Sequence, residues 1–225
     1  KETGYNGTNG LVSRAMDWNN TRWNRGFDLT RNLETGRIQG QDINFQNTLD
    51  TIFTTTTWHP IFRLPTVITE PLRTTTNVYD PDGTQCGARG ALCSKSIQAT
   101  TTPDGFGTPS NVGAPRVWAY SYNANGQVLA ANGPRTDVTD VSTYTYDAQG
   151  NVATISSALG HTTQIPTYNV HGQPLTIIDP NGLTTTLVYD GRQRLTSRDV
   201  GGETTSYTYD NAGQLTKVTL PDTSF

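Results

Sequence analysis

The sequence predicts an all-β chain made of tandem β-hairpins that build a curved, twisted antiparallel sheet. The main observation is a repeat. A tyrosine followed by Asp or Asn and then by turn residues occurs six times, at successive intervals of 43, 24, 22, 21 and 20 residues. The 22 glycines and 12 prolines follow no collagen period, and the single Met and the scarcity of helix-period stretches argue against a helical bundle. With 16% charged residues, the chain also lacks the high charge typical of disorder.

Each repeat begins with a strand that ends in an aromatic residue. In residues 143–146 Thr and Tyr alternate with the period of two that is typical of a strand with one face in water. The aromatic positions of the array are Trp58, Tyr79, Tyr122, Tyr146, Tyr168, Tyr189 and Tyr209. We expect the aromatic rings to stack from repeat to repeat on one face, with the threonine-rich residues before them on the other.

A turn follows the aromatic residue, with Asp or Asn at its first position and Gly three residues later. The side-chain oxygen can accept hydrogen bonds from the backbone ahead of it, and Gly can adopt positive φ, which suits a type I turn with a glycine bulge. The pairs are Asp80 and Gly83, Asn123 and Gly126, Asp147 and Gly150, Asn169 and Gly172, and Asp210 and Gly213. At Asp190 the glycine stands one residue later, at position 191, so we expect a different turn type there.

A second short β-prone run follows each turn, as at residues 152–155, 175–178 and 215–219, and a further turn closes the unit. Two strands and two turns therefore fill one repeat.

The regular array starts no later than Trp58, which precedes Tyr79 by 21 residues and is followed by a turn, residues 59–62, that lacks glycine. Residues 1–57 contain Trp18, Trp23 and Phe27 beside turn-like sequences at 24–26 and 34–37. We interpret this part as divergent or irregular leading repeats. The predicted organisation is therefore a leading segment, residues 1–57, and a repeat array, residues 58–225.

The interval between Tyr79 and Tyr122 is about twice the usual length, and we interpret it as one degenerate repeat with a loop insertion at about residues 84–115. Cys86 and Cys93 lie in this insertion, seven positions apart. The spacing favours a small disulfide over free thiols. It disfavours a metal site, because zinc normally takes four ligands and no suitably spaced His or Cys is present. A disulfide would suit an oxidising destination.

The aromatic-Asp pair, the Asp-x-x-Gly turn and the Asp-Pro-x-Gly-Leu-Thr-Thr connection at residues 179–185 together resemble the YD repeats of bacterial Rhs proteins. More distant relatives of these repeats occur in insecticidal toxin-complex subunits and teneurins. The resemblance covers Trp58 to Phe225 and, less closely, residues 1–57. It implies a β-sheet strip that spirals into a hollow shell, a β-cocoon, around a toxic C-terminal domain. On this resemblance the chain is a non-catalytic wall segment of a larger secreted or cell-surface bacterial protein, with the parent's toxin domain as its cargo.

One stretch of the array is also similar to the Asp-Pro-x-Gly-Leu element at the self-cleavage junction of Rhs proteins. This stretch, residues 179–183, is followed by another ordinary repeat at residues 184–190, and the rest of the junction signature is missing. We therefore interpret it as a turn.

The sequence offers no catalytic site. His59, His161 and His171 each fall in a predicted turn, and no nucleophile elbow, P-loop or zinc-binding helix motif occurs. The recurring aspartates are explained by their turn positions, so a pair of catalytic carboxylates is not indicated. We expect neither enzyme activity nor a cofactor or metal.

Charge and hydropathy restrict the partners. The net charge is −3, and the 16 Lys and Arg residues are scattered, so nucleic acid is not an expected partner. No apolar run approaches the roughly 20 residues that span a bilayer, and membrane insertion is not expected.

Two further possibilities follow from the sequence. The chain could be an adhesion or carbohydrate-binding module that stacks sugar rings on exposed Trp18, Trp23, Trp58 or Trp118, although buried tryptophans that pack between repeats are the alternative. In addition, unpaired strands at the ends of a hairpin array favour end-to-end self-association.

Overall fold

The computed structural model describes residues 2–5, 11–16, 22–41 and 50–222. In these ranges the chain forms eighteen β-strands and no helix. All strand pairings are antiparallel, so the predicted all-β class is confirmed. The chain divides into two compact units, Lys1–Val138 and Thr139–Phe225.

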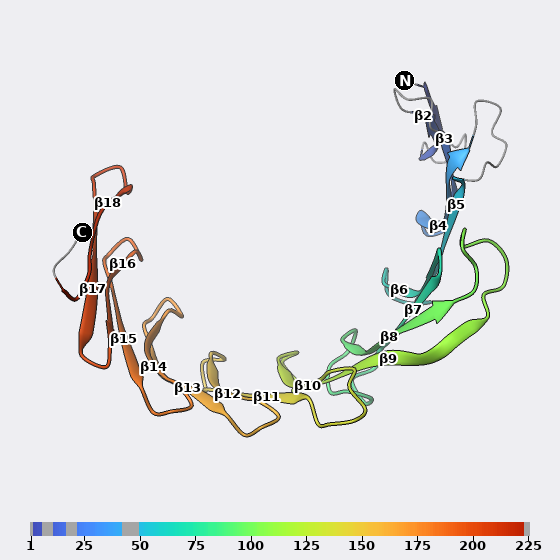
Figure 1. Cartoon of the computed structure of the whole chain (residues 1–225). Coiled ribbons are helices and arrows are strands. Elements are labelled where there is room, and N and C mark those ends of the chain that lie inside the picture. Colours follow the sequence, from blue (N-terminus) through green and yellow to red (C-terminus); the bar gives the residue numbers. More distant parts are fainter. Residues whose placement is uncertain (1, 6–10, 17–21, 42–49, 223–225) are drawn as a thin grey trace. The chain divides into compact units, whose positions relative to one another are not determined.

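The first unit contains ten strands, each hydrogen-bonded to the strand that follows it in the chain (Figure 1). They are β1 (Glu2–Tyr5), β2 (Val12–Met16), β3 (Arg22–Asp28), β4 (Leu33–Gln41), β5 (Ile52–Trp58), β6 (Pro65–Glu70), β7 (Arg73–Tyr79), β8 (Leu92–Thr100), β9 (Asn111–Tyr122) and β10 (Val128–Asn132).

The second unit contains eight strands, which also pair in chain order. They are β11 (Val141–Tyr146), β12 (Val152–Ser156), β13 (Thr162–Tyr168), β14 (Pro174–Ile178), β15 (Thr184–Tyr189), β16 (Leu195–Val200), β17 (Glu203–Tyr209) and β18 (Leu215–Thr219). Two strands and two turns separate one repeat tyrosine from the next, as the sequence predicts.

Each repeat hairpin has a bulge at its aromatic residue. Tyr146, for example, pairs with Val152, and the register shifts between Thr145 and Tyr146. The same shift occurs at Tyr79, Tyr189 and Tyr209. The extra residue increases the local twist of the strands and places the turn residues at a fixed position after each tyrosine. This agrees with the predicted turn and glycine bulge.

The turn-like sequences in the leading segment are a wrong prediction, because residues 24–26 and 34–37 lie inside β3 and β4. Gly26 and Gly36 are directly opposite each other in this pair, and neither has a positive φ. The turn between the two strands begins instead at Asp28, whose carboxylate accepts hydrogen bonds from the backbone N–H groups of Thr30 and Arg31. This turn lacks the glycine that would mark it in the sequence, because Asn32 adopts the positive φ of 53°.

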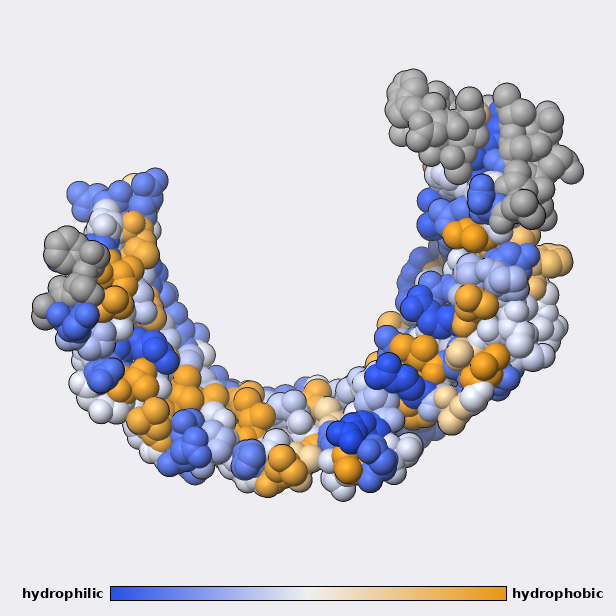
Figure 2. All heavy atoms as spheres, viewed as in Figure 1, coloured by the Kyte–Doolittle hydropathy of each residue, from blue (hydrophilic) through white to orange (hydrophobic). Residues whose placement is uncertain are grey.

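The sheets have almost no apolar core. Within the described ranges each strand contacts only its neighbours in chain order, and the buried apolar residues are Ala15, Leu33 and Leu187. The accessible surface is 13764 Å², whereas a compact protein of this mass exposes roughly 10,000 Å². Figure 2 shows apolar residues in small groups among polar ones on the visible face. Each unit is therefore one layer of sheet, stabilised mainly by pairing between neighbouring strands.

None of the described residues forms a helix that is long and apolar enough to cross a membrane.

Candidate functional site: the repeat turns

The turns after the repeat tyrosines from Tyr122 to Tyr209 share one backbone hydrogen-bond pattern. At Asp147 the backbone N–H donates to the Asn151 carbonyl (2.8 Å), and Gly150 N–H donates back to the Asp147 carbonyl (3.1 Å). The Asp147 Oδ1 atom accepts from the backbone N–H groups of Gln149 (3.0 Å) and Asn151 (2.8 Å). One side-chain oxygen thereby satisfies two backbone donors of the turn.

The same two acceptor bonds recur at Asn123, Asn169 and Asp190, and also at Asp179, which closes a repeat. At Asp210 the Oδ1 atom accepts from Gln214 N–H at 2.8 Å. The turn formed by residues 179–183 is thus of the same kind, as the sequence predicts.

The expectation of a different turn type at Asp190 is wrong. Gln193 N–H donates to the Asp190 carbonyl, and Asp190 N–H donates to the Arg194 carbonyl, both at 2.9 Å. Gln193 takes the position of the glycine with a φ of 65°, close to the 77° to 93° of the glycines in the other repeat turns. The hydrogen bonds of Asp190 fix the turn, and the non-glycine residue bears the backbone strain.

In four of these turns a residue four positions after the Asp or Asn adds a side-chain hydrogen bond, which the sequence analysis missed. Where the turn starts with Asn, its Nδ2 donates to the Oε1 atom of a glutamine, in Asn123–Gln127 (2.7 Å) and Asn169–Gln173 (2.9 Å). Where it starts with Asp, the carboxylate accepts from a donor, either Asn151 Nδ2 (3.0 Å) or Arg194 Nε (2.8 Å). The signal in the sequence is this matching of acceptor and donor at a spacing of four.

These partners also determine the charge state of the aspartates. The hydrogen bond from the Asn151 side chain, opposed by burial and aided by backbone N–H groups of the turn, holds the pKa of Asp147 below its usual range. The backbone N–H of Arg194 and then its side chain lower the pKa of Asp190. Both carboxylates are therefore ionised at neutral pH.

Three repeat tyrosines connect their hairpin to the preceding one. The hydroxyl of Tyr168, at the end of β13, donates to the carbonyl of Val152, at the start of β12 (2.6 Å). Tyr209 bonds Leu195 O (2.8 Å) and Tyr122 bonds Leu92 O (3.0 Å) in the same way. Burial raises the pKa of Tyr168 and Tyr122, with smaller contributions from Asp147 and Tyr120 respectively.

Trp58 has the position and the contact of a repeat tyrosine. Its indole Nε1 donates to the carbonyl of Glu34 near the start of the preceding strand, β4 (2.8 Å). The next residue, His59, replaces the usual Asp: its Nδ1 atom accepts from the backbone N–H groups of Ile61 and Phe62, both at 3.2 Å. His171 donates its backbone N–H within the Asn169 turn, and the His161 carbonyl accepts from Ser157.

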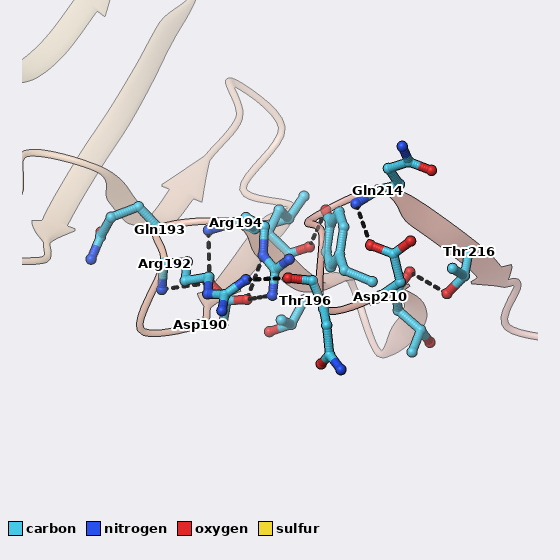
Figure 3. A network of polar contacts seen from close by, with 12 residues as sticks. Asp190, Arg192, Gln193, Arg194, Thr196, Asp210, Gln214 and Thr216 are labelled. Atoms are coloured by element: carbon cyan, nitrogen blue, oxygen red, sulfur yellow. Dashed lines mark hydrogen bonds and ion pairs between the residues drawn. The ribbon is translucent and has the colours of Figure 1, made fainter.

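Further contacts join successive turns along the edge of the second unit (Figure 3). Arg192 Nη1 donates to the carbonyl of Asn211 (2.9 Å), and the Arg194 guanidinium lies 4.5 Å from the centre of the Tyr209 ring. One repeat earlier, Gln173 Nε2 donates to the carbonyl of Gln193 (3.0 Å). The turns that begin at Asn169, Asp190 and Asp210 are thus joined in succession. The contacts form a row of polar interactions along the side of the sheet where these turns lie.

Asp80 is the exception in the array, because it organises a long loop instead of a short turn. Its side chain is fully buried. The Oδ1 atom accepts from Gly83 (2.6 Å) and Asp82 (3.3 Å) N–H groups, and Oδ2 accepts from those of Gln85 (3.0 Å), Cys86 (2.8 Å) and Gly87 (3.2 Å). Burial acts to raise the pKa of Asp80, but the backbone donors outweigh it and lower the pKa to about 2.

Cys86 and Cys93 form a disulfide across this loop, with their Cα atoms 5.5 Å apart, so the pairing favoured from the sequence is confirmed. The Cys86 carbonyl accepts from the backbone N–H of Tyr122 (2.7 Å), which joins the loop to the end of β9. Asp80 lies close to the two sulfurs, the one such group of potential metal ligands in the part of the chain that the structure describes. Both sulfurs are engaged in the disulfide, so they are not thiolate ligands.

Of the four tryptophans, Trp18 lies outside the described residues. Arg25 stacks on the ring of Trp23 at 4.2 Å from its centre, and Arg116 lies 5.3 Å from the ring centre of Trp118. The arginines thus cover part of the Trp23 and Trp118 rings, and the indole N–H of Trp58 is engaged in its part-buried hydrogen bond.

The model of the family described as RHS Repeat matches residues 122–162, 168–202 and 189–224. Residues 122–162 and 168–224 of the chain therefore match RHS repeats. The matched segments contain the tyrosines and turns described above, from Tyr122 to Gly213. No curated protein matches the chain.

Solved structures share the fold of this chain. A structure titled TcdB2-TccC3 without its hypervariable C-terminal region has a TM-score of 0.75 and 14% identity, over 96% of this chain and 11% of that one. TcdB2-TccC3-TEV gives 0.76 and 13%, over 97% and 11%. A Tc holotoxin pore of Photorhabdus luminescens with a TccC3 mutation gives 0.70 and 14%, over 93% and 11%. The chain thus spans about a tenth of the length of the structures it matches.

Proposed function

We propose that this chain is a structural segment of an Rhs-type shell that encapsulates a C-terminal toxin domain of its parent protein and helps deliver it, without being catalytic itself. In this proposal the parent is a bacterial protein that is exported and acts as a secreted or cell-surface protein. The chain has no cofactor, and its partner is the enclosed toxin domain. The leading segment, residues 1–57, and the array, residues 58–225, both belong to the wall.

One observation carries the proposal: the hairpins form a single layer of sheet in which the same polar and tyrosine contacts recur in several repeats. A layer without a core of its own encloses space well but stabilises no compact active site. The fold shared with TcdB2-TccC3 supports the same role, since one of those structures is of TcdB2-TccC3 without its hypervariable C-terminal region.

The tryptophan contacts favour the wall over an adhesion module. Sugar-binding modules present an open aromatic face, whereas Arg25 and Arg116 lie over Trp23 and Trp118, and Trp58 donates a part-buried hydrogen bond to the Glu34 carbonyl. Screening the 225-residue chain on a glycan array tests the alternative. Binding that is lost in Trp23→Ala or Trp118→Ala would support adhesion and count against the wall.

Protease protection in the protein encoded by the complete reading frame tests encapsulation. We expect the polypeptide downstream of the repeats to resist protease in the native protein and to be digested after the shell is opened with denaturant. Equally rapid digestion in both states would rule out enclosure.

The 225-residue chain on its own has an available edge. β18 pairs with β17 on one side, and its other side is unpaired in the described part of the chain. Because such an edge is a template for a further strand, we propose end-to-end self-association of the isolated segment. Light scattering that gives a strict monomer at high concentration would count against it.

A further inference from the structure

The first unit contains a cavity of about 510 Å³, a size within the range of small-molecule sites. Two rows of residues on one face of β3 to β6 line this cavity. Strand register places Asn24, Ile38 and Phe53 in one row. The other row contains Gly26, Gly36, Thr55 and Thr69.

The opposed Gly26 and Gly36 leave bare backbone at the floor of this cavity. Neither has a positive φ, so the turn chemistry that explains most other glycines of the chain does not apply here. A Cβ atom on Gly36 would meet only the Thr54 carbonyl oxygen at 3.6 Å, an ordinary contact. The backbone therefore tolerates a side chain at this position. Because Gly36 has no side chain, the space above the bare backbone stays open as a flat slot. Close approach of a ligand to the backbone is a common reason for glycine in a strand.

The loop 101–110 forms one wall of the cavity. Asp104 accepts a hydrogen bond at its carbonyl from Phe53 N–H (2.7 Å), and Thr102 accepts one from Leu72 N–H (2.8 Å). Gly105 has a φ of 79°, and a Cβ atom there would clash with the Phe53 carbonyl oxygen. The loop is therefore fixed closely against β5, although it follows β8 in the chain.

This loop presents an aromatic ring that is fixed but exposed. Phe106 N–H donates to the Asp104 carboxylate (3.0 Å), and its ring packs against Phe53 with the ring centres 4.7 Å apart and the planes tilted by 46°. The Phe106 residue nevertheless remains 64% exposed. A preorganised exposed ring next to a bare backbone floor provides two flat surfaces for a planar apolar group.

We propose that this cavity is a binding site for a small planar aromatic molecule. The ring of the ligand lies over the Gly26–Gly36 backbone and against Phe53 and Phe106, and the Thr55 and Thr69 hydroxyls lie in reach of a polar substituent. Phe and backbone surfaces favour an aromatic ring over a saturated one of equal size, because ring pairs gain beyond the area they bury. This site is independent of the wall role and is not needed for it.

Saturation-transfer NMR of the 225-residue chain with indole tests the proposal, with cyclohexanol as the saturated comparison. We expect indole to bind with a dissociation constant on the order of 1 mM and cyclohexanol to bind at least roughly tenfold more weakly. In amide spectra of the protein, the chemical-shift changes caused by indole should be confined to Gly26, Gly36 and residues 105–107. No indole binding, equal binding of cyclohexanol, or shifts elsewhere would overturn the proposal.

Two variants locate the site. Gly36→Val suits a strand and fills the slot, so it should keep or raise the melting temperature while weakening indole binding at least roughly tenfold. Phe106→Ala should weaken it similarly. Phe62→Ala is the control, because its ring stacks on His59 outside the cavity and its removal should leave binding unchanged. Unchanged binding in Gly36→Val and Phe106→Ala, or equal loss in Phe62→Ala, would contradict the site.

Discussion

At the scale of single residues, one side-chain oxygen per repeat decides the local structure. The side chain of the Asp or Asn after the tyrosine accepts hydrogen bonds from two backbone N–H groups. The side chain four positions later bonds to it as well, as a donor where the first residue is Asp and as an acceptor where it is Asn. The two halves of this motif are separable, because Asp179 accepts the same backbone bonds but is followed at the fourth position by Leu183. This contrast gives a matched pair of substitutions.

Asp190→Asn should destabilise the chain, whereas Asp179→Asn should be close to neutral. Asn keeps the backbone acceptor bonds in both turns, but at position 190 it removes the charged partner of Arg194, whose Nη2 lies 2.6 Å from the carboxylate. We expect a melting temperature about 2–4 °C lower for Asp190→Asn and a change under about 1 °C for Asp179→Asn. Thermal unfolding followed by circular dichroism measures both, and equal shifts would show that the pair with Arg194 contributes nothing.

Tyr168→Phe should cost about 1 kcal/mol of unfolding free energy, the usual net value of one hydrogen bond, because it removes the 2.6 Å bond to Val152. Tyr144→Phe is the control: the Tyr144 hydroxyl has no hydrogen-bond partner among the described residues, and we expect a change near zero. Urea titration gives both values. A similar cost at the two positions would remove the argument that the hydroxyl connects neighbouring hairpins.

The Asp80 loop should open only in strong acid. Because the pKa of Asp80 is lowered to about 2 in the folded chain, its ionisation contributes stability that is complete above the ordinary carboxyl pKa of roughly 4 and is lost as the pH falls towards 2. We expect the Cys86 and Gly87 amides to stay protected from hydrogen exchange at pH 4 and to lose protection between about pH 3 and 2. Loss of their protection already at pH 5 would contradict this assignment.

At the scale of the element, the hairpin is a unit defined by its hydrogen bonds more than by its glycine. Sequence spacing predicted the strands, the bulged tyrosines and most turns, because period-two patterns and Asp-x-x-Gly turns are local signals. It failed at the Asp190 turn and in the leading segment. Gln193 and Asn32 adopt a positive φ although neither is glycine. Gly26 and Gly36, in contrast, lie inside strands and not in turns. These cases depend on contacts with neighbouring strands that spacing alone does not reveal.

Gln193→Gly should therefore stabilise the second unit, since glycine adopts the left-handed conformation without strain and the backbone bond from Gln173 is kept. The expected gain is about 1 kcal/mol. Gly126→Gln makes the reverse change at a position where nothing lies within 4 Å of an added Cβ, so its expected loss of similar size reports backbone strain alone. A destabilised Gln193→Gly would mean that its side chain matters more than its backbone.

At the scale of the whole molecule, the chain is a nearest-neighbour array within each unit. Its buried groups are mostly polar, and its stability accumulates from one strand pair to the next. The sequence predicted this organisation from the repeat, and the family comparison and the shared fold agree with it. It did not predict the cavity of the first unit, because that site depends on the loop 101–110 reaching β5, a contact between residues about fifty positions apart.

The nuclear Overhauser effects of the 225-residue chain test the single-layer claim most directly. In each unit, we predict that side-chain contacts between strands join only strands adjacent in chain order, apart from those made by the loop 101–110 to β5 and its surroundings. A set of methyl and aromatic contacts between non-adjacent strands, such as β12 with β16, would show a second packed layer and would contradict the account.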